Sequence, residues 1–159
     1  MSRRIPEILI KFLEREEGVR NIPYADPGGV WTVGCGHTGP DVIPGQYWTQ
    51  ARIDATLEAD LAFAVHKLQW AIGDESIAKL SDYQYAALLS FVFNVGAQHN
   101  WSVWGEIRQG RMLLVPAKLL AFDHVGGVEV KGLENRRNAE IALWNGQDPL
   151  CREYPLKAA

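Results

Sequence analysis

Apolar residues recur at helical spacing at the start of the chain. The stripe consists of Ile5, Ile8, Leu9, Phe12 and Leu13. This pattern predicts an amphipathic helix that begins near Pro6, a residue suited to the first turn of a helix. Continuing the same spacing places Glu16 on the apolar face and Glu17 at its edge, so periodicity alone does not select Glu17.

A longer helical pattern occupies the middle of the chain. Its apolar side consists of Ile53, Leu57, Leu61, Ala64 and Leu68. Thr49 precedes this pattern and can cap its first turn, and Gly73 follows it as a helix-ending residue. We therefore expect a helix over about 49–72 that links two lobes.

The segments on either side of this helix differ in character. Residues 18–47 are rich in glycine and proline and contain the β-favouring run Val30-Trp31-Thr32-Val33, which predicts a small sheet. Residues from about 74 to 159 predict a helical lobe. In that lobe, Ser81-Asp82-Tyr83-Gln84 has the form of a capping box, and it opens the apolar segment Tyr85–Val95, which is hydrophobic enough to be a central buried helix. Further helices are expected at about 101–109, 115–122 and 133–144, the last closed by Gly146. The predicted fold class is α+β.

Composition is compatible with one domain. With 159 residues and 47% hydrophobic content, the chain is long enough to bury a core. The first residues are basic, and their short apolar stretch is interrupted by Lys11, so they predict neither a secretory signal nor a membrane span. We therefore expect the product to accumulate in the cytoplasm.

Cysteine and histidine suggest little chemistry. Cys35 and Cys151 are too few and too far apart for a disulfide framework, so reduced thiols are expected. Cys35 with His37 could form a thiol–imidazole pair, but nothing else in the chain suggests acyl transfer, and a small residue between two glycines explains Cys35. The four histidines lack the spacing of metal ligands, so no metal and no cofactor are expected.

Two acids and a hydroxyl near the small sheet suggest glycosidic-bond hydrolysis. Glu17 ends the first predicted helix, Asp26 precedes Pro-Gly-Gly, and Thr32 lies on the β run. The reaction requires a protonated acid beside the leaving oxygen and an ionised carboxylate near the attacking water. A glutamate against apolar side chains suits the first role, an aspartate in a polar turn suits the second, and Thr32 could orient the water. The spacing alone is more typical of a solvated charge run, Glu14 to Glu17, leading into a hairpin.

Three blocks of sequence carry a family resemblance that covers nearly the whole chain. They are Glu17-x8-Asp26-x5-Thr32 within EGVRNIPYADPGGVWTVGCGHTG, SFVFNVG over Ser90–Gly96, and GLENRRNAEIALW over Gly132–Trp144. In order and spacing they resemble the phage-type, T4-lysozyme-like endolysins of glycoside hydrolase family 24. The resemblance implies a lysozyme-like α+β fold with a substrate cleft between its lobes. It also implies muramidase activity, with Glu17 as general acid, Asp26 positioning or activating water, and Thr32 assisting.

The resemblance also implies substrate-binding residues. It places Asn94 beside the cleft, where an amide can hydrogen-bond an N-acetyl group or a sugar hydroxyl, although a helix-ending asparagine is an equally good interpretation of the pattern. An arginine of the last helix, Arg136 or Arg137, is expected to reach Glu17, and Arg137 is our choice. We count Asn94, His37 and Arg137 as the substrate-binding candidates.

The tryptophans and two departures complete the picture. Trp31 alternates with Thr32 and is expected to pack, while Trp70 and Trp144 are expected to be structural. The sequence leaves three tryptophans open: Trp48, Trp101 and Trp104. Phe122-Asp123 stands where many relatives carry Trp-Asn, and the formal net charge of −3 is unexpected for an enzyme that attacks an anionic wall.

Two functions are compatible with these features. The first is an endolysin that cleaves the β-1,4 bond between N-acetylmuramic acid and N-acetylglucosamine. The alternative is a muramidase-like module that binds peptidoglycan or a protein with little or no cleavage. Glu17, Asp26 and Thr32 together favour the enzyme, because a binding module does not need the acid. We expect a monomer without nucleic-acid partners that depends on a holin-like membrane permeabiliser to reach its substrate.

Overall fold

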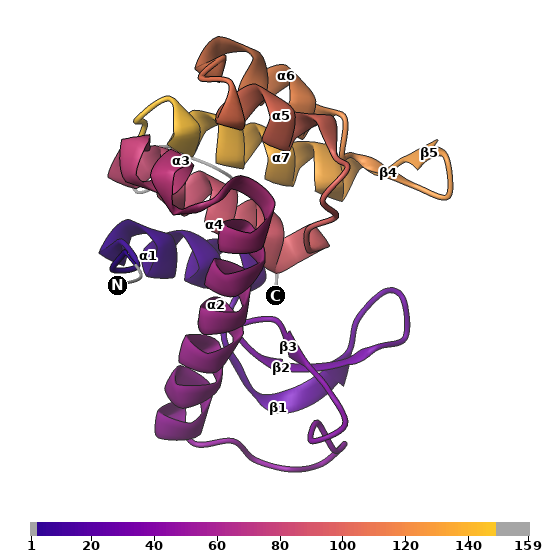
Figure 1. Ribbon diagram of the computed structural model, residues 1–159. Helices are drawn as coiled ribbons and strands as arrows, with labels where there is room; N and C mark the ends of the chain where they lie inside the picture. Colours follow the sequence, from indigo (N-terminus) through magenta and orange to yellow (C-terminus); the bar gives the residue numbers. More distant parts are fainter. Residues whose placement is uncertain (1–2, 149–159) are drawn as a thin grey trace. The chain divides into compact units, whose positions relative to one another are not determined.

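The computed structural model describes residues 3–148 and divides them into two compact units. One unit is formed by Ile10–Phe63, and the other by the described residues on both sides of that segment. Helices α1 (Glu7–Glu17) and α2 (Gln50–Ile72) each contribute residues to both units (Figure 1). The mixture of helices with small antiparallel sheets confirms the predicted α+β class.

The unit Ile10–Phe63 contains a three-stranded antiparallel sheet. Its strands are β1 (Arg20–Ala25), β2 (Trp31–Gly34) and β3 (His37–Thr38), hydrogen-bonded in that order (Figure 1). The register sets Tyr24 opposite Thr32, and Thr32 opposite Thr38. The small sheet expected from the glycine- and proline-rich segment is therefore confirmed.

This sheet packs against the start of α2. The buried cluster consists of Val33, Val42, Trp48 and Ile53. A Cβ atom at Gly34 would lie 3.2 Å from Ile53 Cγ2, so a larger residue in this strand would have to displace the Ile53 side chain. Thr49 caps the helix as predicted, because its hydroxyl oxygen accepts a hydrogen bond from the Arg52 backbone N–H at 3.3 Å.

The second unit is helical apart from one small hairpin. Its elements are α3 (Asp74–Lys79), α4 (Asp82–Val95), α5 (Ser102–Arg108), the 3-10 helix η1 (Met112–Leu114), α6 (Val115–Leu120), β4 (His124–Val125), β5 (Val128–Glu129) and α7 (Lys131–Trp144). Helix α4 is its centre: it packs along α7 (Figure 1), and all residues from Tyr85 to Val92 are buried. The predicted central helix is confirmed, because a helix that is apolar all round requires neighbours on every side.

The predicted ends of these helices are also observed. Ser81 Oγ accepts from the Gln84 backbone N–H at 3.1 Å, and the Gln84 side chain accepts from the Ser81 N–H at 2.9 Å, which is the predicted capping box. Gly146 follows α7 with φ +79°, a conformation that favours glycine.

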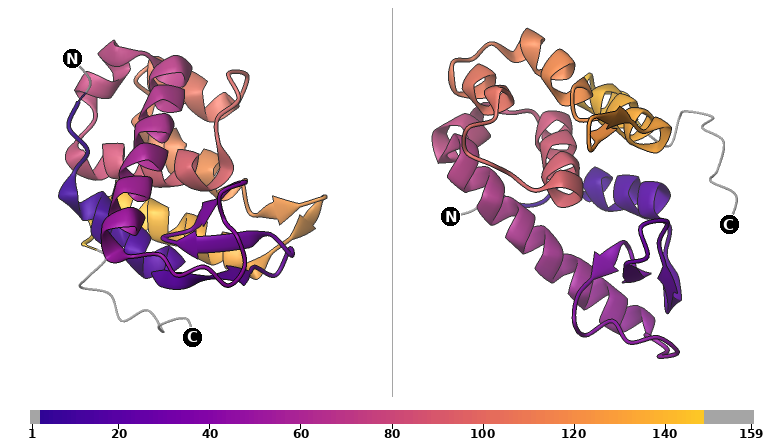
Figure 2. Two further views of the ribbon diagram at one scale, coloured as in Figure 1. Left: turned by 90° about the horizontal axis from the view of Figure 1, so that it is seen from below. Right: turned by 90° about the vertical axis from the view of Figure 1, so that its right-hand side faces the viewer.

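Three short elements were not predicted: α3, η1 and the β4–β5 hairpin. Helix α3 has only six residues and η1 only three. The β4–β5 hairpin turns through Gly126 and Gly127, both at positive φ, and its strands are exposed and extend away from the helices of this unit (Figure 2). Elements this short contain too few residues for a hydrophobic periodicity to be recognised in the sequence.

An aromatic cluster covers the end of α4 and explains how Phe122 is accommodated. The Phe122 ring contacts Phe91 edge-on at 4.9 Å and lies 4.6 Å from the Trp101 ring, measured between centroids. Trp104 is fully buried against Phe91 and donates its indole N–H to the Gln98 carbonyl at 2.9 Å. Phe122 therefore packs as an apolar member of this cluster.

The exposures of the tryptophans correct two expectations. Trp144 is buried as predicted, but Trp31 is 42% exposed and Trp70 is 60% exposed. Trp31 and Thr32 do alternate, yet Thr32 faces the interior, so the expected packing of Trp31 is wrong. The Trp70 ring lies on the surface against His99, at 4.9 Å between centroids.

Candidate active site

Glu17 lies where α1 ends. Gly18 follows it with φ +70° and donates its backbone N–H to the Glu14 carbonyl at 3.0 Å, after which the chain turns into β1. A residue in this left-handed conformation stops the helix and reverses the chain direction. The Glu17 side chain is half-buried, at the helix end where the sequence motif predicted it.

The turn between β2 and β3 lies against the Glu17 carboxyl. A Cβ atom at Gly36 would lie 3.1 Å from both Cδ and Oε2 of Glu17, and Gly36 has φ +77°. The left-handed backbone conformation favours glycine, and any side chain at this position would have to displace the Glu17 carboxyl. The glycine-rich segment of the sequence therefore brings the turn after β2 against the Glu17 carboxyl.

Asp26 closes the loop that connects β1 to β2. Its Oδ1 accepts a hydrogen bond from the Val30 backbone N–H at 2.8 Å, and its own N–H donates to the Val30 carbonyl at 2.9 Å. A Cβ atom at Gly28 would lie 3.3 Å from the same Oδ1. The Asp26 carboxylate is therefore held in one position by the backbone of its own loop.

Thr32 is tied to the same peptide as Asp26. Its side chain is buried, and its hydroxyl donates to the Val30 carbonyl at 3.1 Å. With its hydrogen used in this way, the hydroxyl oxygen retains lone pairs that can accept. The structure thus brings Asp26 and Thr32 together through Val30.

Tyr24 belongs to this group, although the sequence analysis did not select it. It lies on β1 opposite Thr32, and the Arg20 guanidinium lies 4.2 Å above its ring. Burial raises the pKa of the Tyr24 phenol, Arg20 opposes this, and the negative charges of Glu17 and Asp26 raise it further. A raised pKa keeps the phenol protonated, so Tyr24 is a hydrogen-bond donor among the acids. Its position in the sequence, two residues before Asp26 and at the end of the strand that leads to it, was the available signal.

His37 connects the sheet to α2. One ring nitrogen, Nδ1, lies 2.7 Å from Asp60 Oδ2, and the other, Nε2, lies 3.1 Å from Asp41 Oδ1. Burial lowers the pKa of His37, but the hydrogen bonds to Asp60 and Asp41 outweigh it, so the pKa is raised. Both ring nitrogens are thus engaged within the protein, and binding of substrate by His37 stays a prediction.

Cys35 is packed as a small buried residue. It is 3% exposed and forms no disulfide, and both ring nitrogens of His37 lie against the carboxylates of Asp60 and Asp41. Cys151 lies outside the described residues. Within residues 3–148, no three or more His, Cys, Asp or Glu side chains are grouped as metal ligands. In the same part of the chain, none of the helices has the length and apolar character to cross a membrane.

Asn94 and Arg137 lie together in the helical unit. Arg137 Nη2 donates to Asn94 Oδ1 at 2.7 Å, which joins the end of α4 to α7. Arg137 is fully buried and forms an ion pair with Glu140, whereas Asn94 is exposed. The expected pairing of Arg136 or Arg137 with Glu17 stays a prediction.

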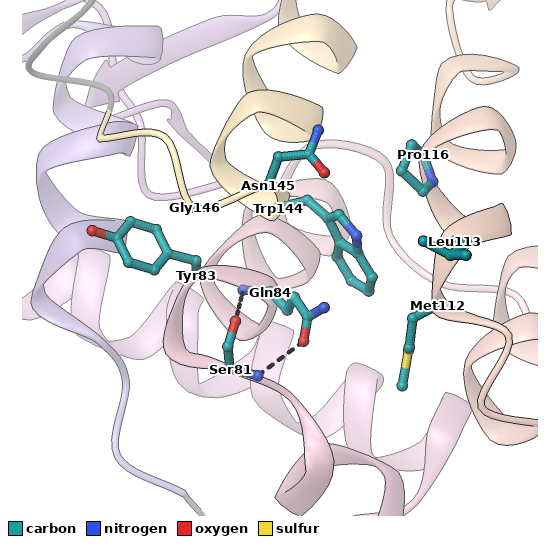
Figure 3. Close-up of a pocket in the computed structure, with 9 residues that line it drawn as sticks. All are labelled: Ser81, Tyr83, Gln84, Met112, Leu113, Pro116, Trp144, Asn145 and Gly146. Carbon is teal, nitrogen blue, oxygen red and sulfur yellow. Dashed lines mark hydrogen bonds between the residues drawn. The ribbon is translucent and has the colours of Figure 1, made fainter.

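A surface hollow of about 430 Å³ in the helical unit is separate from these residues. It is lined by Ser81, Tyr83, Gln84, Met112, Leu113, Pro116, Trp144, Asn145 and Gly146 (Figure 3). Figure 3 shows the two hydrogen bonds of the capping box at its edge. The lining contains no carboxyl, imidazole or thiol group, and the Tyr83 phenol is its one titratable side chain.

The chain is similar to known phage enzymes. The family model described as Phage lysozyme matches residues 14–140. The SAR-endolysin of Enterobacteria phage PA-2 is 36% identical over 135 residues, which are 82% of this chain and 79% of that protein. The SAR-endolysin of Escherichia phage Mu is 34% identical over 139 residues, 84% of this chain and 78% of that protein.

Solved structures share the fold. The active form of the P1 phage endolysin Lyz has a TM-score of 0.80 at 25% identity, covering 96% of this chain and 89% of that one. The muramidase domain of SpmX from Asticaccaulis excentricus has a TM-score of 0.75 at 26% identity, covering 89% of this chain and 97% of that one.

Proposed function

The chain belongs to the phage lysozyme family, and from this membership we propose which of its residues carry out the reaction. It is a lysozyme, a peptidoglycan hydrolase of the endolysin class that serves lysis of the host cell. The bond cleaved is the β-1,4 link between N-acetylmuramic acid and N-acetylglucosamine. The catalytic assignment rests on one observation: the Glu17 carboxyl lies against the turn that follows the strand of Thr32.

Glu17 acts as the general acid. Cleavage requires a proton on the glycosidic oxygen as its bond to the anomeric carbon breaks, because an alkoxide is a poor leaving group. Glu17 is held at a helix end, half-buried, with Gly36 against its carboxyl, so its reach toward a bound sugar is restricted to few conformations. Restricting the acid in this way favours proton transfer in the transition state.

Asp26 and Thr32 act on the water. One oxygen of Asp26 is bound to the Val30 N–H, and we assign the other oxygen to the attacking water. The Thr32 hydroxyl gives its hydrogen to the Val30 carbonyl, so its oxygen can accept a hydrogen from the same water. As positive charge develops at the anomeric carbon, the ionised Asp26 carboxylate also stabilises it.

Lysis assays and product analysis test this proposal. Purified protein added to chloroform-treated Gram-negative cells should clear the suspension, and mass spectrometry of the digest should find muropeptides that end in reducing N-acetylmuramic acid. Anhydro-muropeptides would instead indicate transglycosylation, and binding to sacculi without release of fragments would indicate a binding module. Either of these two results would contradict the proposed hydrolysis.

We further propose that the enzyme acts as a monomer, is made in the host cytoplasm and reaches its substrate with help from a membrane-permeabilising protein. The support is chemical, since peptidoglycan lies outside the inner membrane. Cells that produce the chain alone should lyse only after chloroform or a co-produced holin opens the membrane, and lysis without either would contradict this dependence.

A further inference from the structure

A phenol hydroxyl lies beside Thr32 in the unit Ile10–Phe63. Tyr24 is directly opposite Thr32 in the β1–β2 register, and residues opposite one another in an antiparallel pair share a face, with Cβ atoms about 4.5–5.5 Å apart. Tyr24 is half-buried, and within residues 3–148 its hydroxyl forms no hydrogen bond with another protein group. The phenol is therefore placed beside Thr32 with its donor still available.

The Tyr24 ring is held by a cation on its own strand. The Arg20 guanidinium lies 4.2 Å from the ring centroid, within the range of a cation–π interaction. Gly34 is the residue opposite Arg20 on β2, so no side chain of that strand competes for the space beside the arginine. A guanidinium over one face of the ring favours one ring orientation, and with it one position of the hydroxyl.

The surroundings of Tyr24 keep its hydroxyl protonated. Burial raises the pKa of the phenol and Arg20 lowers it, while the acidic groups of Glu17, Asp26 and Cys35 raise it further. The net pKa is raised, so the hydroxyl retains its hydrogen at neutral pH and stays a donor. All of these groups belong to the unit Ile10–Phe63, so the arrangement is complete within that unit.

The attacking water of the proposed reaction has one hydrogen-bonding position left. It gives one hydrogen to Asp26 and the other to Thr32, and one of its two lone pairs attacks the anomeric carbon. The remaining lone pair needs a donor. An ionised Asp26 has no hydrogen to give, and the Thr32 hydroxyl has already given its hydrogen to the Val30 carbonyl. The Tyr24 hydroxyl is the donor beside Thr32.

We propose that Tyr24 is a further catalytic residue whose hydroxyl donates a hydrogen bond to the attacking water, and that Arg20 is the positioning residue that orients its ring. The inference rests on the proposed function, since its ligand is the water of that reaction. As the water oxygen bonds to the anomeric carbon, its proton passes to Asp26, and the glycosidic oxygen leaves with the proton of Glu17. The Tyr24 proton stays on Tyr24. Its hydrogen bond fixes the lone pair that does not react, so that the other is directed at the carbon.

Tyr24→Phe removes the hydroxyl and keeps the ring over which Arg20 lies, so the fold should be retained. With soluble peptidoglycan fragments as substrate, kcat should fall roughly three- to tenfold, the value of one hydrogen bond. KM should stay unchanged, because the lost contact is to the water and not to the glycan. Tyr47→Phe is the matched control, since Tyr47 is 68% exposed in the same unit, and it should keep both constants. An unchanged kcat, or a rise in KM alone, would overturn the proposal.

A pH profile separates donation by the hydroxyl from packing of the ring. A fluorinated tyrosine whose phenol ionises near neutral pH can be incorporated at position 24 with little change of shape. This protein should be active at acidic pH and lose kcat as the fluorinated phenol ionises, because a phenolate cannot donate. The same residue at position 47 should leave the profile of the parent unchanged. If the substitution at position 24 also left the profile unchanged, the hydroxyl would have no part in the reaction.

The role of Arg20 is tested by a double-mutant cycle. Arg20→Met removes the guanidinium and keeps an apolar stem beside the ring, so kcat should fall toward the value of Tyr24→Phe. In the protein that carries both substitutions, kcat should be close to that of Tyr24→Phe alone, because Arg20 acts through the hydroxyl. Independent, multiplicative losses would overturn the positioning role.

The two levels of the proposal fail in different ways. If the parent enzyme releases muropeptides while Tyr24→Phe keeps the parent kcat, only this inference fails. If the parent neither lyses cells nor releases muropeptides, the proposed function itself fails.

Discussion

The carboxyl group of Glu17 lies directly against the backbone of Gly36. Even a single added methyl group at Gly36 would come within 3.1 Å of Glu17 Oε2. The acid belongs to a helix end and the glycine to a strand turn, so this contact joins the two elements that carry the candidate chemistry. Gly36 therefore forms part of the immediate surroundings of the Glu17 carboxyl.

Gly36→Ala should impair both stability and lysis. A side chain at φ +77° costs about 1–2 kcal/mol of unfolding free energy, and the new methyl group also displaces the Glu17 carboxyl. Gly45→Ala is the control, because Gly45 has φ +80° and nothing within 4 Å of its added Cβ. Urea unfolding should show similar losses for both variants, with lysis impaired only in Gly36→Ala. Equal lytic activity in the two would exclude the contact from the mechanism.

Glu17→Gln should abolish nearly all lysis and leave the fold intact. An amide cannot supply the proton, so turnover should fall by about 10²-fold or more. Glu16→Gln changes the neighbouring acid and should retain most activity in the same turbidity assay. If Glu16→Gln proved to be the inactive variant, the helical periodicity would have identified the acid better than the motif did.

Asp26→Asn and Thr32→Val should each reduce turnover without unfolding the sheet. Asparagine can still accept from the Val30 N–H, so the loop is preserved while the charge is lost, and turnover should fall by roughly 10²–10⁴-fold. Thr32→Val removes the hydroxyl and its bond to the Val30 carbonyl. Cys35→Ser is the control and should change turnover little. Inactivation by iodoacetamide that disappears in Cys35→Ser would instead support a catalytic thiol.

The pairs formed by His37 predict a window of pH stability. The pKa of His37 is raised in the folded protein. Its contribution to the free energy of unfolding is therefore complete below the pKa of the unfolded chain, near 6.5, and is lost as the pH rises through the folded pKa. The pKa of Asp41 is lowered, mainly by its hydrogen bond to His37. Its contribution to the free energy of unfolding is therefore present above the pKa of the unfolded chain, near 3.8, and is lost on acidification. The pairs should therefore stabilise most between about pH 4 and 6.5.

Asp60→Asn measures this effect. It should lower the free energy of unfolding by about 1 kcal/mol near pH 5.5, since both partners are half-buried, and by less at pH 9. Glu75→Gln, which breaks the exposed pair with Lys79, serves as the comparison and should show almost no loss. A pH-independent loss in Asp60→Asn would mean that the His37 charge does not contribute.

Glu140→Gln should be strongly destabilising. Glu140 is fully buried and pairs with both Arg136 and Arg137, so removing its charge takes away the carboxylate that these two buried guanidiniums share. A loss of about 3–5 kcal/mol in unfolding free energy is expected from breaking such a cluster. Ser90→Ala removes one hydrogen bond to this carboxylate and one from Arg136, keeps the charge, and should cost about 1–2 kcal/mol. Thermal unfolding followed by circular dichroism would compare them, and equal losses would contradict a charged Glu140.

Local signals in the sequence determined much of the secondary structure. The Thr49 cap and the Ser81–Gln84 capping box involve residues within one helical turn, and each is formed as predicted. The uniform hydrophobicity of Tyr85–Val95 likewise identified the buried helix. Such signals act between neighbours in the chain, so they survive in the sequence itself.

Tertiary structure alone decided the contacts that give these elements their roles. Helix α3 was not predicted, and its carbonyl at Ile77 accepts from Arg3, 74 positions earlier. Trp31 was expected inside, but which face of β2 is buried depends on what packs there. The approach of Gly36 to Glu17 and the hydrogen bond from Arg137 to Asn94 likewise depend on how the elements pack in three dimensions. The sequence motifs identified Glu17 and Asn94, but the folded chain determined which residues each of them contacts. These contacts join residues that are far apart in the sequence, and such separations carry no periodic signal.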